Sequence, residues 1–226
     1  MSEFNIKNID WQISNDLVPY KNGLDFMERR VRNIIDKDYN SMIWLLEHHD
    51  VYTAGISAKD EDMLNKTDIE IFKINRGGKY TYHGPNMLIG YLMLDLKKFF
   101  VSGKPDIAKF VIFIETWVIN FLAKFDIEGF IRKDRVGIWV LENGQEKKIG
   151  AIGIKVKKWV TYHGLAINID PDLNAFNNIV PCGISNFGVT SLKNLGVNMD
   201  QDFNSLLKEA FYETTSLSLR GAPASL

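Results

Sequence analysis

The sequence contains a single cysteine, Cys182, among its 226 residues. One cysteine excludes an intrachain disulfide and fits a reducing compartment. This cysteine and the four histidines show none of the spacings that are typical of a metal site, such as C-x-x-C or H-E-x-x-H. We therefore expect a protein without a bound structural or catalytic metal.

The sequence also lacks a long apolar run and an excess of charge of one sign. Its most apolar stretch, residues 107–125, is interrupted by charged residues and is interpreted as a buried helix rather than a transmembrane span. With 27 basic and 28 acidic residues, the chain has no overall attraction to nucleic acid or to anionic membranes. The first residues lack the basic and apolar segments of a secretory signal. These absences predict a cytoplasmic protein.

No proline- or serine-rich linker divides the chain, so we expect one domain over residues 1–226, with a flexible tail over 216–226. Apolar spacing and composition predict helices over 19–36, 105–125 and 201–214, and strands over 42–47, 69–75, 87–96, 135–141, 148–157 and 159–169. The pair Asn143-Gly144 predicts a hairpin turn. The fold class is α+β, with a mainly antiparallel or mixed β-sheet and segregated helices.

Cys182 and Lys148 are the candidate catalytic residues. Cys182 lies between a proline and a glycine, and a tight turn of that kind can present a thiol as a nucleophile. Lys148 follows Lys147 and precedes small residues, and like charge with burial can lower the pKa of such an amine. The pair suggests acyl transfer, and the alternative is that Cys182 is an inert buried thiol.

The four histidines are the remaining side chains that could titrate near neutral pH at a catalytic site. His83 and His163 could help a thiol to ionise. His48 and His49 lie beside an apolar strand, and we interpret them as structural.

A glycine-rich segment over residues 76–86 is a second candidate. Its glycines allow close approach of the backbone to a ligand, and Arg76, Thr81 and His83 supply hydrogen-bond donors. The spacing matches neither a Walker A loop nor a dinucleotide-binding fingerprint, and a hydrogen-bonded hairpin is the alternative. The sequence Thr-Tyr-His-Gly at 81–84 recurs at 161–164, either because two edges face one cavity or by chance.

A basic run precedes residue 160. Lys155, Lys157 and Lys158 are followed by Trp159. The run either guards a solvated strand edge against aggregation or forms a docking patch for an acidic protein.

Three stretches in collinear order, 76–96, 147–170 and 179–184, together with a weaker one at 45–55, are similar to the lipoyl(octanoyl) transferase family of lipoate biosynthesis. The resemblance implies the fold of biotin and lipoate protein ligases, a mixed sheet flanked by helices with a tunnel for an acyl chain. It implies that octanoyl passes from octanoyl-acyl carrier protein to an enzyme cysteine. The acceptor is then a lysine on the lipoyl domain of a 2-oxoacid dehydrogenase E2 subunit or of the glycine-cleavage H protein. The thioester donor is already activated, so no cofactor is expected.

Carried over by position, the resemblance makes Cys182 the acyl-thioester nucleophile and Lys148 the residue that lowers its pKa and relays protons. The implied substrate-binding residues are Arg76, Gly77, Gly78, Lys79, Tyr80, Thr81, Tyr82, His83, Ala151, Ile152, Gly153, Gly164, Leu165 and Ala166.

The chain departs from the family pattern in two places. Asn86 and Met87 stand where the family usually has glycine and glutamine, and His49-Asp50 replaces a usual proline pair. Asparagine tolerates left-handed backbone geometry, so we expect the turn at Asn86 to survive.

Three other functions stay open on the residues alone. An ATP-dependent lipoate or octanoate ligase would use Lys148 without Cys182. A Cys-His thioesterase would use His83 or His163 as a base. A non-enzymatic carrier would form no acyl-enzyme.

Overall fold

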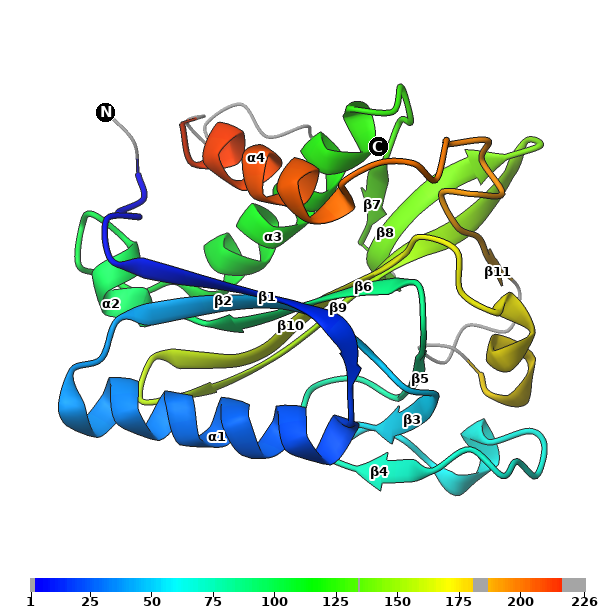
Figure 1. Cartoon of the computed structure of the whole chain (residues 1–226), viewed down its shortest axis with the longest axis horizontal. Helices are drawn as coiled ribbons and strands as arrows, with labels where there is room; N and C mark the ends of the chain where they lie inside the picture. Colours follow the sequence, from blue (N-terminus) through cyan, green and yellow to red (C-terminus); the bar gives the residue numbers. More distant parts are fainter. Residues whose placement is uncertain (1–2, 134, 181–186, 217–226) are drawn as a thin grey trace.

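A computed structural model describes residues 3–133, 135–180 and 187–216. A twisted sheet runs through the middle of the molecule (Figure 1). Helix α1 (Tyr20–Lys37) covers one face of the sheet, and α3 (Ile107–Ala123) and α4 (Phe203–Ser216) cover the other. The helices are close to the expected ones, and Ser216 belongs to α4 rather than to a tail; the rest of the expected tail lies outside the described residues.

The large sheet has the strand order β1-β2-β6-β10-β9-β8-β7, with β11 beside β9. Its strands are β1 (Ile9–Val18), β2 (Ser41–His48), β6 (Met87–Met93), β7 (Phe130–Arg132), β8 (Arg135–Glu142), β9 (Gln145–Lys157), β10 (Val160–Asn168) and β11 (Gly188–Val189). The β1–β2 and β9–β11 pairs are parallel, whereas β2–β6, β6–β10, β10–β9, β9–β8 and β8–β7 are antiparallel. The mixed sheet expected from the sequence is thus confirmed.

A small second sheet carries the glycine-rich segment. It has the order β4-β3-β5, formed by β4 (Ile71–Lys73), β3 (Val51–Ala54) and β5 (Tyr80–His83). The short helix α2 (Leu96–Phe99) and the 3-10 turns η1 (Asp60–Asp62) and η2 (Leu173–Asn178) complete the described elements. The strand expected over residues 69–75 is shorter in the structure, where β4 covers only Ile71–Lys73. A loop connects β4 to β5.

Two apolar clusters lie on opposite faces of the large sheet. Met27, Val31 and Ile34 on α1 are buried at helical spacing against one face. Trp117 on α3 is fully buried against the other face, and its Nε1 donates to the Leu207 carbonyl of α4 at 2.7 Å. Because both faces are covered, every residue of β6 is buried.

The turn between β8 and β9 has Asn143 at φ 51° and Gly144 at φ 77°. Two positive φ values in succession are characteristic of a tight hairpin turn, so the Asn-Gly prediction is confirmed. Among the helices described, none combines the length and the apolar character needed to cross a bilayer.

Candidate active site

A cavity of about 560 Å³ lies between the glycine-rich segment and the strands β9 and β10. The residues that line it include all the expected substrate-binding residues except Tyr82: Arg76, Gly77, Gly78, Lys79, Tyr80, Thr81, His83, Ala151, Ile152, Gly153, Gly164, Leu165 and Ala166. Residues from two distant motifs therefore converge on one space. The apolar side chains Ile89, Ile152, Ile154 and Leu165 also contact it.

Tyr82 does not line this cavity. Its hydroxyl donates to the Asp50 carboxylate at 2.6 Å, and its ring packs edge-on against Phe176 in η2. Neighbouring side chains in a strand point to opposite faces, so Tyr82 points away while Thr81 and His83 reach the cavity. Tyr82 is a buried structural residue of the small sheet.

Arg76 fixes the glycine-rich segment against β3. Its Nη2 donates to the carbonyl and the hydroxyl oxygen of Thr53 at 2.8 and 2.7 Å, and its Nη1 donates to the Gly77 carbonyl at 2.9 Å. Gly55 makes this close packing possible, because a Cβ there would lie 2.3 Å from the Gly78 carbonyl oxygen. The buried guanidinium is thus part of the cavity wall and holds the loop in place.

Small residues of β9 form the opposite wall. A Cβ at Gly153 would lie 3.6 Å from both Arg76 Cδ and the Gly77 carbonyl oxygen, so the glycine-rich segment packs closely over this strand. Ala151 leaves room beside it and lines the cavity. The small residues after Lys148 therefore have two effects: Gly153 allows the glycine-rich segment to approach the strand closely, and Ala151 leaves space for the cavity.

Two histidines, His83 and His163, and two tyrosines, Tyr20 and Tyr91, line the cavity, and His48 lies behind them against Tyr91. His48 Nδ1 lies 2.7 Å from the Val18 carbonyl and must donate to it, so His48 Nε2 accepts from the Tyr91 hydroxyl at 2.7 Å. The His83 ring lies 6.1 Å from His48 and is stacked near Tyr20. His48 is fully buried and hydrogen-bonded, as a structural histidine would be, whereas His49 is exposed.

Burial keeps these histidines uncharged near neutral pH. Desolvation lowers the pKa of His48 to about 4. Desolvation, with the nearby Arg76 charge, lowers the pKa of His163 to about 3 and that of His83 well below its usual value. Each imidazole can therefore accept or donate a hydrogen bond but carries no charge. Because Thr81, His83, His163 and Gly164 all line the cavity, the repeated Thr-Tyr-His-Gly sequences do face one space.

Lys148 lies beside this cavity, in β9. It is buried, and its Nζ donates to the Val136 carbonyl at 2.9 Å. A neighbouring hollow of about 20 Å³ is lined by Lys148 together with Thr81, Ala151 and Ala166, which also line the large cavity. Lys148 thus lies next to the large cavity, and the residues between them line both spaces.

Lys147 and Lys148 have different surroundings although they are neighbours in sequence. Lys147 forms an ion pair with Glu142, whereas Lys148 Nζ lies 5.9 Å from the Trp139 ring centroid. Successive side chains in a strand point to opposite faces. The sequence pair Lys-Lys therefore does not place two ammonium groups side by side.

Cys182 lies outside the described residues, but the chain on either side of its segment is placed. The Val180 amide donates to the Asp62 carbonyl at 2.8 Å. After the segment, β11 pairs with β9 so that Val189 is the register partner of Lys148.

The departures from the family pattern have clear local effects. Asn86 has φ 60°, so the left-handed turn survives as expected. Its amide donates to Glu47 Oε2 at 2.6 Å. Met87 lines the small hollow beside Lys148, and Asp50 accepts the Tyr82 hydrogen bond.

Sequence reasoning missed several residues of the cavity. Tyr20 begins α1 and Tyr91 lies inside an apolar strand, so both are typical of a core. Arg135 lies at the start of β8, over the Phe187 ring at 3.9 Å. No local signal marks these residues, because only the tertiary fold brings them to the cavity.

The profile of the lipoyl protein ligase A/B catalytic domain matches residues 19–212. An octanoyltransferase from Wolbachia sp. subsp. Brugia malayi (strain TRS) is 45% identical over 206 residues, which cover 91% of this chain and 98% of that protein. An octanoyltransferase from Bartonella henselae is 44% identical over 213 residues, covering 90% of this chain and 85% of its own.

Solved structures support the fold. A bi-partite lipoate protein ligase from Thermoplasma acidophilum, studied with its E2 lipoyl domain, has a TM-score of 0.66 at 16% identity, with 94% of this chain and 86% of that chain covered. A biotin protein ligase from Aquifex aeolicus has a TM-score of 0.51 at 14% identity, with 93% and 71% covered. The catalytic fold of lipoate and biotin protein ligases is thus confirmed, and the chain is an acyltransferase that belongs to the lipoyl protein ligase A/B catalytic-domain family, among its octanoyltransferases.

Proposed function

We propose that this chain transfers an octanoyl group from octanoyl-acyl carrier protein, through a thioester on Cys182, to the lysine of a lipoyl domain. The observation that carries the proposal is the position of Lys148. It is buried next to a cavity that is lined by two of the three stretches that carry the octanoyltransferase resemblance, 76–96 and 147–170. The acceptors would be the lipoyl domains of E2 subunits and of the H protein.

The chemistry proceeds in two balanced steps. The Cys182 thiolate attacks the thioester carbonyl, and the carrier thiol leaves with the proton that Cys182 gave up. The acceptor amine then attacks the Cys182 thioester, loses one proton, and expels the thiol as an amide forms. Lys148 relays the proton in both steps and favours the thiolate. The Arg76–His83 segment without Tyr82, the Ala151–Gly153 segment, and Gly164, Leu165 and Ala166 hold the acyl chain.

The cavity suits an eight-carbon chain. Burial of its methylenes at about 0.8 kcal/mol each would contribute on the order of 5 kcal/mol. His163 and Ala166 are three positions apart in β10, which corresponds to about 10 Å of cavity wall at about 3.3 Å per residue. Seven carbon–carbon bonds of about 1.5 Å zigzag to a similar length, roughly 9 Å.

We assign the catalytic domain to the whole chain and the reaction to the bacterial cytoplasm. The family profile covers residues 19–212, and the curated relatives come from bacteria.

A transfer assay tests the proposal. Octanoylation of a lipoyl domain is followed by mass spectrometry, with octanoyl-acyl carrier protein as the donor and without ATP. Cys182→Ser should abolish transfer. Transfer by Cys182→Ser that requires ATP and free octanoate would contradict the proposal and indicate a ligase. Rapid release of free octanoate without an acceptor would indicate a thioesterase.

A further inference from the structure

The end of the acyl cavity next to Lys148 is formed by small side chains. Ala151 of β9 and Ala166 of β10 are register partners, and both line the cavity as well as the small hollow that Lys148 lines. Thr81 of β5 also lines both spaces. Under the proposed function the reacting end of an acyl chain lies here, and its methyl end points along the strands, away from Lys148.

The far end of the cavity carries polar rings instead. They come from four different elements: Tyr20 from α1, His83 from β5, Tyr91 from β6 and His163 from β10. The His163 ring lies 6.3 Å from the Tyr91 ring, and the His83 ring is stacked near Tyr20 at 6.4 Å. In β10, His163 is three positions from Ala166, so this end lies about 10 Å from the reacting end. We call these four residues the polar end.

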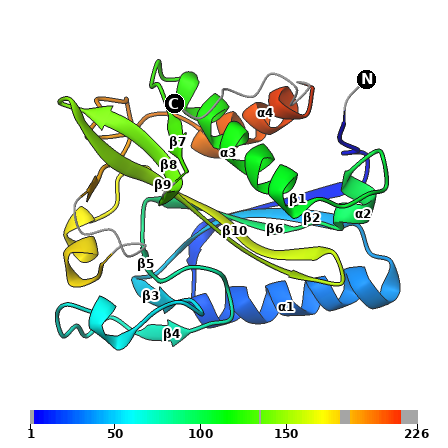
Figure 2. The same cartoon turned by 180° about the vertical axis from the view of Figure 1, so that it is seen from behind.

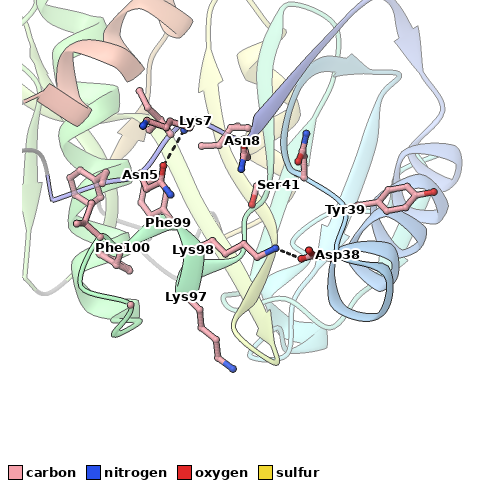
Figure 3. A pocket seen from close by; sticks show the side chains of 16 residues that line it. Asn5, Lys7, Asn8, Asp38, Tyr39, Ser41, Lys97, Lys98, Phe99 and Phe100 are labelled. Atoms are coloured by element: carbon pink, nitrogen blue, oxygen red, sulfur yellow. Dashed lines mark hydrogen bonds and ion pairs between the residues drawn. The ribbon is translucent and has the colours of Figure 1, made fainter.

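The polar end is closed, whereas the reacting end is open. Tyr20 is 5% exposed, Tyr91 3% and His163 7%. Val136, whose carbonyl accepts from Lys148, is 60% exposed and lines the same cavity. The groove of about 940 Å³ between the N-terminal segment and α2 (Figure 3) does not continue the cavity, because the two spaces share no lining residue. An acyl chain that is too long therefore presses against the polar end.

The His163 ring reaches the cavity through an unusual backbone. His163 has φ 57° inside strand β10 although it is not a glycine. In a regular strand its side chain would share the face of Leu165, which packs in the apolar cluster on the α3 side. Its ring lies instead beside Tyr91, which packs on the α1 side, where Figures 1 and 2 show the small sheet. Such strained residues tend to occur at functional positions.

The polar end has hydrogen-bonding groups that the protein leaves unused. Within the described residues, neither the His163 ring nor the Tyr20 hydroxyl has a hydrogen-bond partner, and His83 Nδ1 is buried without one. Burial lowers the pKa of both imidazoles, so neither carries a charge near neutral pH. An alkyl chain offers no donor or acceptor. Methylene groups that cover these rings therefore remove polar groups from water without replacing their hydrogen bonds.

We propose that the polar end sets the upper limit of acyl chain length by its polarity, so that the cavity favours an eight-carbon chain over a ten-carbon chain. The inference rests on the proposed function and names the residues that select its donor. An eight-carbon chain of roughly 9 Å ends at the polar end, whereas two further carbons add about 2.5 Å and must cover it. His163 is the main specificity-determining residue, because its strained backbone directs the ring to this position.

Equilibrium binding of two thioethers tests the proposal independently of the transfer reaction. S-octyl- and S-decyl-N-acetylcysteamine have no carbonyl group and cannot acylate Cys182, and calorimetry gives their dissociation constants. In an apolar cavity, two additional methylenes strengthen binding roughly tenfold. The wild type should show the opposite order and bind the octyl compound at least threefold more tightly than the decyl compound.

His163→Met and His163→Gln form a matched pair, because both new side chains are unbranched, similar in length and subject to the same backbone strain. His163→Met makes the polar end more apolar and should bind the decyl compound at least threefold more tightly than the octyl compound. His163→Gln keeps a hydrogen-bonding group and should keep the wild-type order. Tyr20→Phe removes one hydroxyl without changing β10, and it should shift the ratio of the two constants in the same direction as His163→Met.

Tighter binding of the decyl compound by the wild type would overturn the proposal, as would failure of the octyl compound to bind. An equal change of the ratio in His163→Met and His163→Gln would also overturn it, since the size of the ring and not its polarity would then set the limit. Circular dichroism checks that each variant is folded. Acylation by octanoyl-N-acetylcysteamine is followed separately by intact mass. No adduct in a wild type that binds the octyl compound would reject the transfer mechanism and leave the binding result unchanged.

Discussion

At the scale of single residues, the site depends on glycines, which leave room for their neighbours, as much as on reactive side chains. Gly137 has φ 132°, and a Cβ there would lie 2.3 Å from Lys148 Cε and 2.8 Å from its Nζ. The Lys148 hydrogen bond to Val136 thus requires a glycine at the next position. Nothing in the sequence around Gly137 indicates this role, because the contact forms only when β8 pairs with β9.

We predict that Gly137→Ala displaces Lys148 and lowers octanoyl transfer at least tenfold. Gly144→Ala is the matched control, since Gly144 has φ 77° in the adjoining turn and nothing within 4 Å of its Cβ position. Both variants carry backbone strain, but only Gly137→Ala collides with Lys148. Transfer rates are compared at a temperature where circular dichroism shows both variants folded. Equal loss of rate in the two variants would contradict the role of Gly137.

The buried histidines predict a loss of stability in mild acid. An unfolded histidine takes up a proton below about pH 6.5, whereas the pKa of folded His48 is about 4. Protons therefore favour the unfolded chain between these values, and the free energy of unfolding falls with pH by up to about 1.4 kcal/mol per unit for each such histidine. The stability supplied by neutral His48 is present above pH 6.5 and is lost towards pH 4.

Replacing His48 with glutamine should reduce that slope. We expect urea unfolding of His48→Gln to lose about 1.4 kcal/mol less per pH unit between pH 6 and 4.5 than the wild type does. The exposed His49→Gln is the control for the same chemical change. An unchanged slope in His48→Gln would show that His48 does not remain neutral in the fold.

At the scale of elements, long periodic or apolar segments were predictable and short ones were not. The apolar spacing of α1 and α3 and the Asn-Gly turn of the β8–β9 hairpin have local causes. Strand β1 was missed because its residues are only half-buried or exposed and show no clear alternation. The short strand β3 contacts the buried Arg76 through Thr53 and pairs with the short strand β5, and no local pattern predicts these contacts.

The packing of the glycine-rich segment against β3 should tolerate no side chain at position 55. Its Cβ would lie 2.3 Å from the Gly78 carbonyl oxygen, so Gly55→Ala must push this loop away from β3. We expect a loss of about 1 to 3 kcal/mol in the free energy of unfolding and a transfer rate reduced at least tenfold. Gly196→Ala, at φ 83° with open space around it, should cost less and leave the rate unchanged. Comparable transfer rates in the two variants would show that the position of this loop does not affect catalysis.

At the scale of the whole molecule, the sequence motifs and the fold agree. Segments near residues 80, 150 and 165 meet at one cavity because β5 faces the adjacent strands β9 and β10. The order of the motifs indicated the family, and the mixed sheet with helices on both faces confirms the expected architecture. The tyrosines of the cavity, Tyr20 and Tyr91, reach it only through the tertiary structure, so the sequence alone could not reveal them.

The most direct test of the central claim is the intact mass of the protein after incubation with octanoyl-acyl carrier protein alone. We predict an octanoyl adduct that maps to Cys182, is absent in Cys182→Ser, and disappears when a lipoyl domain is added. An unmodified protein that nevertheless octanoylates the lipoyl domain, or an adduct on another residue, would contradict the thioester mechanism.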